Sequence, residues 1–591
     1  MIPLRYGCVI FIVAIFVVTL GSGCSSSNKP LSISPTSAAL APGQTMQFEL
    51  SERKKVTWSV GGVVGGNATV GTIDANGNYT APSASTSTKV MVTATAGMAQ
   101  ASAQVLVVAP GIVAPTANPQ VALYTISPPD DATVTIQFGQ TTNYGLTTWT
   151  QPSPTGGGAV AIFVAGMLAN TPYHMQATVK FSSGLTFTDI DHTFTTTALP
   201  AEKIPTLTAS TTPGMTPQGG VELLELNGVT NTTQVRVAAT DLAGNVLWGY
   251  DPGPTVIGGP GPVKLLPNGH LLMNFGSQPD GTSSTIQEVD LGGNVVWQMT
   301  AAQLNEALAA ATCAGCNITV VGTHHDIAIL PNGHLIVIAA QQKVESGLTG
   351  FPNPVTVTGD VIIDLDQNHN PVWLWSEFDH LDVNRHPFMF PDWTHANSIV
   401  YSPDDKDLIF SMRHQFWVIK IDYNGGQGTG NIVWKLGFQG DFTLQNGTDP
   451  IDWFYAQHDA NVASMNSSGV FQLILFDNGN NRILDTSGTI CGSGTPCFSR
   501  VPIMQLDESA KTATIEWVDD LSPVFSFFGG NAELLANGNV EFDECASTGT
   551  TADVFEVTKT MPPQTVWQMH ISGSNAYRVV RTPSFYPGVQ W

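Results

Sequence analysis

A repeated phrase that ends in tryptophan is the sequence feature that most constrains the fold of this chain. The first two copies read DLAGNVLW and DLGGNVVW, and the later copies keep a β-rich stretch that closes on Trp. The six copies end at Trp248, Trp297, Trp373, Trp434, Trp517 and Trp567. Repeats of this kind are typical of β-propellers, in which each repeat forms one four-stranded blade. Six repeats therefore predict six blades.

A second repeated phrase predicts a hairpin in most of these blades. It reads LLPNGHLLM from Leu265 and ILPNGHLIV from Ile329, and further copies start at Tyr401, Met465 and Leu534. An Asn-Gly turn between two apolar strands is a strong hairpin signal. Charged residues make up only 12% of the chain, and turn residues recur throughout, as expected for many short strands. We expect an all-β protein in which residues 199–591 form a six-bladed β-propeller.

The first 23 residues have the pattern of an export signal. Arg5 supplies a positive charge, the run CVIFIVAIFVVTL is apolar, and the small residues of LGSGC lead to Cys24. The pattern resembles bacterial lipoprotein signals, with an ordinary signal peptide or a short membrane anchor as the alternative. We expect residues 1–23 to be the signal, Cys24 to carry the lipid and residues 24–30 to be a linker. The protein is then exported to the periplasm or cell surface and lipid-anchored to a bacterial membrane.

Two segments between the linker and the propeller predict β-sandwich domains. Residues 31–108 contain short alternating strands separated by turn residues and resemble a bacterial immunoglobulin-like domain. Residues 109–198 repeat this pattern and resemble a fibronectin type III module, in which Tyr173 can lock a strand corner. Neither segment clusters catalytic side chains. We expect both to act as spacers, with glycan or surface binding as the alternative.

The charge of the chain narrows the range of partners, and its cysteines suggest local disulfides. The chain has 46 acidic and 22 basic residues, a net charge of −24 and no Lys/Arg cluster that could follow a phosphate backbone, so we expect no nucleic-acid partner.

The close pairs Cys313/Cys316 and Cys491/Cys497 are candidate local disulfides of an exported protein, with Cys545 left over. Spacing does not decide the pairing. The CAGC motif could also indicate redox chemistry or zinc, but no thioredoxin-like βαβ pattern surrounds it.

Three histidines fall at nearly equivalent positions in three successive repeats. The strands that lead into the hairpins read THHDIAILPNG, WTHANSIVYSPDD and QHDANVASMNSSG, and they place His325, His395 and His458 in register. The innermost strands of a propeller surround its central channel, so these side chains should meet in space. Arg413 could reach the same channel and complete a site for a sulfuryl or phosphoryl group. One neutral His can attack such a group while another protonates the departing oxygen.

Other interpretations of these histidines stay open at this point. Three imidazoles can hold zinc, although the adjacent Arg413 argues against a dication, and we expect no metal. His324 could replace His325 as the inward-facing residue if the strand register slips by one. His414 adjoins Arg413 and should point to the opposite face of its strand.

Together these phrases resemble the bacterial arylsulfate sulfotransferases, which are six-bladed propellers. The resemblance covers about Pro200 to Trp591 and rests on HHDIAILPNGH, DWTHANSIVY, SMRHQFWVIKID and FYAQHDANV. It implies transfer of a sulfuryl group from a phenolic sulfate ester to a phenol by ping-pong steps, through a sulfohistidine and without a nucleotide or other cofactor. By position, His458 would match the nucleophile. The residues that would hold the sulfuryl oxygens and assist proton transfer are His325, His395, Asn397 and Arg413, with His324 as a further binding candidate.

Two other classes of protein fit parts of the sequence. The DLAGNVLW-type closures look somewhat like those of quinone-cofactor propellers, but those enzymes need more blades. A non-catalytic surface lectin or adhesion scaffold would account for the sandwich segments. It would not account for three aligned histidines beside an arginine.

Overall fold

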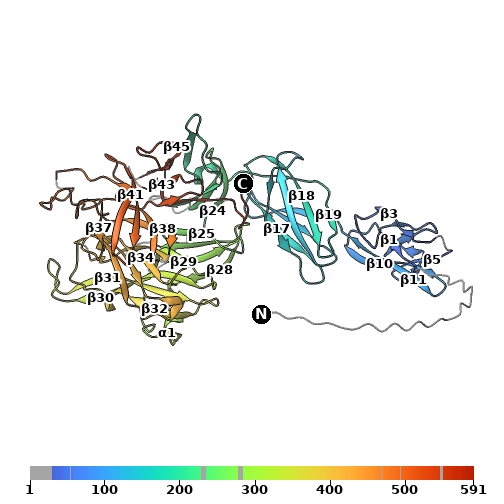
Figure 1. Cartoon of the computed structure of the whole chain (residues 1–591), viewed down its shortest axis with the longest axis horizontal. Helices are drawn as coiled ribbons and strands as arrows, with labels where there is room; N and C mark the ends of the chain where they lie inside the picture. Colours follow the sequence, from blue (N-terminus) through green and yellow to red (C-terminus); the bar gives the residue numbers. More distant parts are fainter. Residues whose placement is uncertain are drawn as a thin grey trace, which may run out of the picture. The chain divides into compact units, whose positions relative to one another are not determined.

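The computed structural model describes residues 30–591 apart from 53–54, 228–234, 277–283, 390, 468, 493 and 546–549. The predicted signal, Cys24 and all but the last residue of the linker lie outside the described residues. The chain divides into two compact units, residues 1–108 and 109–591. Nearly all of the regular structure is β, which confirms the predicted all-β class (Figure 1). No described helix combines the length and the apolar character needed to cross a membrane.

The first unit folds around a core of its own. Trp58 and Tyr79 are buried there with alternating residues of the longer strands. One sheet has the order β2-β11-β10-β5-β6, a second has the order β3-β9-β8-β7, and β1 pairs with β4. The strands are β1 (Ile33–Ser34), β2 (Ser37–Leu40), β3 (Thr45–Gln47), β4 (Glu49–Leu50), β5 (Thr57–Val60), β6 (Val63–Val64), β7 (Gly66–Asn67), β8 (Gly71–Ile73), β9 (Asn78–Thr80), β10 (Thr88–Ala96) and β11 (Ala99–Val107). The immunoglobulin-like assignment stays a prediction.

The second unit begins with two further sheets. One has the order β12-β13-β17, and the other is built on the β14–β18 pair with β15, β16, β19 and β20. The hydroxyl of Tyr173 on β18 accepts the backbone N–H of Leu168 at 3.0 Å, a bond of the kind that locks a strand corner. The strands are β12 (Ile112–Pro115), β13 (Ala122–Ile126), β14 (Ala132–Gly139), β15 (Leu146–Thr147), β16 (Gln151–Pro152), β17 (Val160–Val164), β18 (Pro172–Phe181), β19 (Thr186–Thr188) and β20 (His192–Thr195). The fibronectin type III assignment stays a prediction.

Six sheets follow, built from β21 to β46. From inner to outer strand their orders are β46-β22-β23-β24, β25-β26-β27-β28, β29-β30-β31-β32, β33-β34-β35-β36, β38-β39-β40-β41-β37 and β42-β43-β44-β45-β21, and we number these blades 1 to 6. Inner strands of successive blades contact one another, as in a propeller. The ring of blades closes through two strands that come from opposite ends of the propeller sequence. The C-terminal β46 (Asn575–Thr582) joins blade 1, while β21 (Thr206–Thr211) joins blade 6.

The remaining elements of the blades are short. In blades 1 to 3 they are β22 (Val221–Asn227), β23 (Val237–Thr240), β24 (Val246–Tyr250), β25 (Gly259–Leu265), β26 (Leu271–Gly276), β27 (Thr285–Val289), β28 (Val295–Thr300), β29 (Gly322–Ile329), β30 (Leu335–Glu345), β31 (Val355–Leu365) and β32 (Pro371–Ser376). In blades 4 to 6 they are β33 (Ala396–Tyr401), β34 (Leu408–Met412), β35 (Trp417–Ile421), β36 (Ile432–Gly437), β37 (Thr443–Leu444), β38 (His458–Ser467), β39 (Val470–Phe476), β40 (Arg500–Asp507), β41 (Thr512–Asp520), β42 (Ala532–Leu534), β43 (Val540–Glu544), β44 (Thr551–Val557) and β45 (Thr565–Ser572). Connections contain helix α1 (Ala301–Ala310) and the 3-10 turns η1 (Ala201–Lys203), η2 (Glu377–Asp379), η3 (Arg413–Gln415) and η4 (Asn424–Gly426).

Four of the six repeated tryptophans bond to a neighbouring blade through the indole N–H. The indole N–H of Trp248 in blade 1 donates to the carbonyl of Leu291 in blade 2 at 2.8 Å. Trp567 in blade 6 donates to the carbonyl of Leu242 in blade 1 at 2.7 Å, so the same contact also closes the ring. Trp434 and Trp517 donate to the next blade in the same way, whereas in blade 3 the bond comes from Trp375, two residues after the repeated Trp373. A large apolar ring with one N–H donor is suited to this position, because it packs in the core and still pairs its polar atom.

Two disulfides cross-link residues within loops of the propeller. Cys313 pairs with Cys316 directly after α1, and Cys491 pairs with Cys497 in the loop between β39 and β40. Cys545 is a free, buried thiol. The two local bridges proposed from the spacing are therefore formed.

Candidate active site

The three aligned histidines lie where the inner strands of blades 3, 4 and 5 are irregular. His325 is in β29, His395 directly precedes β33 and His458 begins β38. The pairing of each strand with its neighbour shifts register at or next to the histidine. His325 and His395 also have left-handed backbone angles, with φ of 57° and 49°. Bulges and such angles re-aim side chains, and they concentrate near functional sites.

These irregularities bring the histidine rings into one cluster. The ring centroids of His325 and His395 are 4.8 Å apart, and those of His325 and His458 are 6.5 Å apart. His324 lies behind this cluster. Its Nδ1 is 2.7 Å from Nδ1 of His325, and its Nε2 is 3.0 Å from the carboxylate of Asp360. His325 is therefore the residue of the pair that joins the other histidines.

Tyr577 on β46 completes the cluster. Its ring centroid is 5.6 Å from that of His325 and 6.0 Å from that of His458. Its hydroxyl is buried and has no hydrogen-bond partner among the described residues. Burial raises the pKa of this phenol, so the hydroxyl keeps its proton and can donate it in a hydrogen bond. The site thus contains an unused donor.

Arg578, the next residue, connects three of the inner strands. Its guanidinium is 3.2 Å from Asp459 and 3.5 Å from Asp326, and it donates to the backbone carbonyl of Asn397. The side-chain amide of Asn397 donates to the backbone carbonyl of Gln457 at 2.7 Å, directly before His458 in the chain. The Oδ1 of Asn397 is buried without a partner among the described residues. The predicted binding residue is therefore held beside the cluster.

Asn478 fixes the tautomer of His458. The amide nitrogen of Asn478 donates to the carbonyls of Ser526 and Gly529 at 2.8 and 3.0 Å, which directs its Oδ1 toward the imidazole. That oxygen lies 2.6 Å from Nδ1 of His458, so Nδ1 must carry the proton. The lone pair is then on Nε2, whose partner is the backbone N–H of Gly529 at 3.3 Å.

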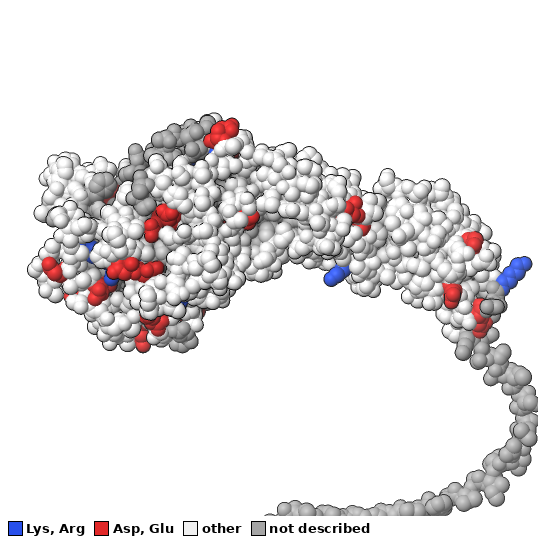
Figure 2. Space-filling model, turned by 90° about the horizontal axis from the view of Figure 1, so that it is seen from above, with Lys and Arg blue, Asp and Glu red and all other residues white. Residues whose placement is uncertain are grey.

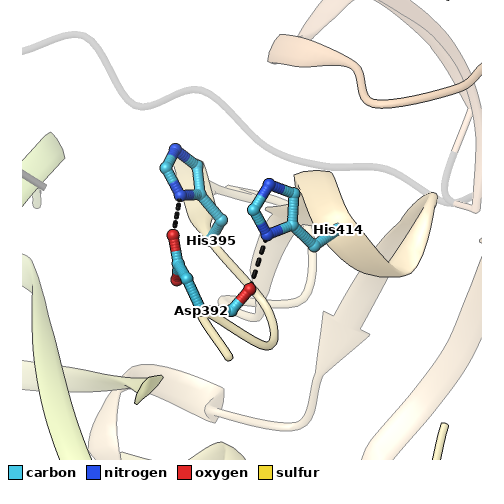
Figure 3. A group of neighbouring side chains, drawn as sticks. All are labelled: Asp392, His395 and His414. Carbon is cyan, nitrogen blue, oxygen red and sulfur yellow. Dashed lines mark hydrogen bonds and ion pairs between the residues drawn. The ribbon is translucent and has the colours of Figure 1, made fainter. Parts of the chain in front are cut away.

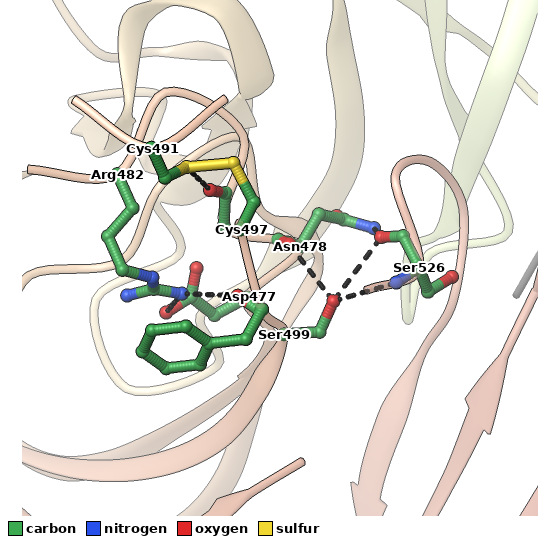
Figure 4. Close-up of a disulfide and its surroundings, with 9 residues drawn as sticks. Asp477, Asn478, Arg482, Cys491, Cys497, Ser499 and Ser526 are labelled. Carbon is green, nitrogen blue, oxygen red and sulfur yellow. Dashed lines mark hydrogen bonds and ion pairs between the residues drawn. A yellow bond between two sulfur atoms is a disulfide. The ribbon is translucent and has the colours of Figure 1, made fainter. Parts of the chain in front are cut away.

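The segment that carries Asn478 is itself held in place (Figure 4). The hydroxyl of Ser499 donates to the backbone carbonyl of Asn478 at 2.9 Å and accepts the backbone N–H of Ser526 at 3.0 Å. The disulfide between Cys491 and Cys497 closes the following loop. Interactions of this kind, one step removed from a reactive side chain, fix its orientation.

Asp392 fixes the orientation of His395, as Asn478 does for His458 (Figure 3). The carboxylate of Asp392 accepts the Nδ1–H of His395, and its backbone carbonyl accepts the Nδ1–H of His414 at 2.6 Å. The two imidazole rings stack, with centroids 4.6 Å apart. Burial disfavours the charged carboxylate, but the imidazoles of His395 and His414 outweigh it and lower the pKa of Asp392 to about 2. Asp392 is therefore ionised, and Nε2 of His395 is left for a substrate.

Arg413 lies in the turn η3 and not in a strand. Because a 3-10 turn separates successive side chains by roughly 120° and a strand by roughly 180°, the expectation that His414 points to the opposite face is wrong. His414 lies beside Arg413, and its Nε2 accepts from the guanidinium at 2.7 Å. The guanidinium also donates to the carbonyl of Phe527 at 2.8 Å and lies over the ring of Phe388, 5.6 Å from its centroid.

Burial sets the charge state of the cluster. It lowers the pKa of His325, His414 and His458 well below 6.5, and neighbouring imidazole or guanidinium groups lower it further. These imidazoles are therefore neutral at pH 7. Burial also lowers the pKa of Arg413, to about 10, which leaves the guanidinium charged. The site combines neutral nitrogen bases with a fixed cation, as transfer of an anionic group requires.

The same region offers a spacing that could hold a metal ion. Ligand atoms of Asp392, His395 and His414 lie within 4.8 Å of one another. The donor set does not fit a metal, because Nδ1 of His414 carries a proton for a carbonyl and Nε2 already accepts from Arg413. A guanidinium this close would also repel a dication. We therefore derive no step through a metal.

Asp392, Asn478, Tyr577 and Arg578 were not predicted as site residues. Asp392 and Asn478 lie in irregular segments between strands. Residues 476–482 read FDNGNNR, an amide-rich turn that contains Asn478 and was the one available signal in the sequence. Tyr577 and Arg578 reach the site because β46 closes blade 1 by pairing with β22, which lies at the opposite end of the propeller sequence. The repeated phrases could not show this, since β46 lies beyond the last of them.

Solved structures resemble the chain at low identity. A member of the DUF4221 family from Bacteroides vulgatus is 8% identical and has a TM-score of 0.31, with 64% of this chain and 98% of that chain covered. A quinoprotein alcohol dehydrogenase-like protein from Bacteroides thetaiotaomicron is 7% identical and has a TM-score of 0.18, with 93% and 96% covered. No curated protein matches the chain.

A family model gives a more specific result. The model for arylsulfotransferases matches residues 194–578, which is more than half of the chain. The match begins before β21 and includes every residue of the cluster described above, from His324 to Arg578. The chain belongs to the arylsulfotransferase family.

Proposed function

We propose that the protein transfers a sulfuryl group from a phenolic sulfate ester to a phenol through a covalent intermediate on His458. Membership of the family supports arylsulfotransferase activity in general. The observation that carries the finer proposal is the bond between Nδ1 of His458 and Asn478, because it leaves a neutral imidazole with its lone pair on Nε2. A neutral, oriented imidazole is a competent nucleophile that needs no cofactor.

In the first half of the reaction, the 3.3 Å bond from the backbone N–H of Gly529 to Nε2 of His458 breaks, and Nε2 attacks the sulfur of the donor ester. An N–S bond forms as the ester S–O bond breaks, and the electron pair of that bond leaves on the aryl oxygen. His395 supplies a proton to this oxygen from Nε2. The buried carboxylate of Asp392 stabilises the positive charge on His395 before the transfer and holds the ring in place.

The second half reverses these steps with an acceptor phenol. His395 takes the phenolic proton, the phenol oxygen attacks sulfur, and the N–S bond breaks to return the lone pair to His458. Donor and acceptor use the same site in turn, which gives ping-pong kinetics. The proton on Nδ1 of His458 stays with Asn478 throughout.

Fixed donors stabilise the sulfuryl oxygens during both transfers. Arg413 supplies a guanidinium whose Nε is buried without a partner among the described residues, and Tyr577 supplies an unpaired hydroxyl. His325 lies between His395 and His458 and supplies a further nitrogen. Donors oriented before the reaction stabilise developing charge at no cost in reorganisation.

The same proposal includes the location of the protein. We infer that residues 1–23 direct export and that Cys24 anchors the chain by a lipid to a bacterial membrane, in the periplasm or at the cell surface. The two disulfides are compatible with an oxidising compartment. The face drawn in Figure 2 carries scattered acidic side chains and few basic ones, which argues against a nucleic-acid partner.

The experiment that tests this function is transfer of sulfate from 4-nitrophenyl sulfate to phenol without added nucleotide. We expect nitrophenol release that depends on phenol and that disappears in His458→Ala. His570→Ala is the matched control, because His570 lies on the outer part of blade 6 and is half-exposed. Equal turnover by His458→Ala and the control would exclude His458 as the nucleophile.

A further inference from the structure

A cavity of about 440 Å³ lies in the channel of the propeller, apart from the histidine cluster. Inner strands of blades 1, 2, 3, 5 and 6 contribute its walls. None of the clustered histidines lines it, and neither does Tyr577. Arg578 is shared by the two regions and lies between them, held by Asp326 and Asp459. A cavity of this size is large enough for a small molecule.

Carboxylates outnumber cations in this cavity. Its acidic residues are Glu225, Asp326, Asp459 and Glu533, and its basic residues are Lys264 and Arg578. Both cations are already used by the two aspartates. Lys264 is 2.7 Å from Asp326, and Arg578 bridges Asp326 and Asp459. Neither glutamate forms an ion pair among the described residues, although Arg578 and Arg581 lie near them. Burial raises the pKa of each glutamate to about 7, so a bound cation would favour its ionised form.

Glu225 has an oxygen with no partner. Its side chain is 2% exposed, and its Oε1 accepts the backbone N–H of Val263 at 2.7 Å. Its Oε2 has no hydrogen-bond partner among the described residues. Glu533, from the adjacent blade 6, accepts the backbone N–H of Arg581 at 3.0 Å. A buried, unpaired carboxylate oxygen is costly, so a ligand that supplies a donor would be stabilised here.

Besides the polar Asn461, Asn531 and Thr582, the rest of the lining is apolar, and this apolar part selects the kind of cation. Aliphatic side chains in the wall include Leu223, Val263, Leu265, Ile474, Leu534 and Val580. A bare metal ion would make no use of these groups. The carboxylates of the cavity also do not bring three ligand atoms within 4.8 Å of one another, since the described residues contain such a set only at Asp392.

We propose that this channel cavity binds a small organic cation, an alkylammonium or alkylguanidinium. Its charged group donates to Glu225 and Glu533, and its alkyl part packs against Leu223, Val263 and Leu534. Charge-assisted hydrogen bonds to the carboxylates provide orientation, and burial of the alkyl part adds affinity. This binding is independent of sulfuryl transfer at the histidines.

Calorimetric titration of the purified protein with n-butylammonium chloride tests the proposal. We expect saturable binding that weakens at least about tenfold in Glu225→Gln and in Glu533→Gln, the loss of one charge-assisted bond being worth that factor or more. Glu544→Gln is the matched control, because Glu544 is also a buried carboxyl but does not line the cavity. We expect it to bind like the wild type.

Two neutral or inorganic probes complete the test. n-Butanol has the alkyl chain without the charge, and calcium chloride supplies a cation without the chain, so neither should bind with comparable affinity. Absence of n-butylammonium binding to the folded wild type would overturn the proposal. Equal affinity in Glu225→Gln and Glu533→Gln would overturn it as well, and so would calcium binding tighter than the amine.

Discussion

Replacing Asp392 by Asn tests how the proton on the departing phenol is controlled. The neighbouring imidazoles lower the pKa of Asp392 from 3.8 to about 2 despite its burial. After the opposing cost of burial, this difference corresponds to a net gain of roughly 2 kcal/mol for the ionised carboxylate, at 1.36 kcal/mol per pKa unit. His395 makes the largest of the favourable contributions, so the carboxylate stabilises a charged His395 by up to this amount. Its loss should lower kcat by roughly 10- to 30-fold, since a tenfold change in rate corresponds to about 1.36 kcal/mol.

The assay is turnover of 4-nitrophenyl sulfate with phenol as acceptor, measured over a range of pH. Asp382→Asn is the matched control, because Asp382 is exposed in the same loop and bonds to its neighbour Asn384. We expect Asp392→Asn to lower kcat more than it raises KM, to fold normally and to change the pH profile. A kcat within about threefold of the control, less than 1 kcal/mol, would refute the proposed role of Asp392.

Three further results are expected. Tyr577→Phe removes an unpaired hydroxyl while keeping the ring, so kcat should fall ~10- to 100-fold with no loss of thermal stability; unchanged kcat would mean that Tyr577 only packs. Asn478→Ala leaves Nδ1 of His458 unpaired, so kcat should fall ~10- to 100-fold with an altered pH profile, and an unaltered profile would contradict the tautomer assignment. Burial raises the pKa of Glu544 to about 7, so its stabilising contribution is complete below about pH 4.5 and is lost as pH rises through 7. Thermal unfolding should show this decline in the wild type and a smaller one in Glu544→Gln, and identical profiles would count against it.

The propeller could be predicted because each blade needs the same local features, a tight turn and a tryptophan, and these repeat in the sequence. Each repeated phrase pairs a tight turn with a tryptophan, and the structure shows that Trp248 and Trp567 bond to the next blade through their indole N–H. The alignment of His325, His395 and His458 follows from the same periodicity. Equivalent positions of neighbouring inner strands face one channel, so register in the sequence becomes proximity in space.

The rest of the site depends on features that no repeat encodes. The bulges at His325 and His395 involve positive φ angles, which the residue types do not require. Asp392 and Asn478 lie in connections whose paths are set by tertiary contacts. Tyr577 belongs to β46, whose partner β22 lies beside it in space but at the opposite end of the propeller sequence.

Detection of the covalent intermediate tests the central claim most directly. The protein is mixed with 4-nitrophenyl sulfate in the absence of acceptor, and its mass is measured intact and after proteolysis. The proposed mechanism predicts a gain of one SO₃ group on the peptide that contains His458, its removal on addition of phenol and no gain in His458→Ala. Phenol-dependent turnover with no sulfated protein, or with the group on another residue, would contradict it.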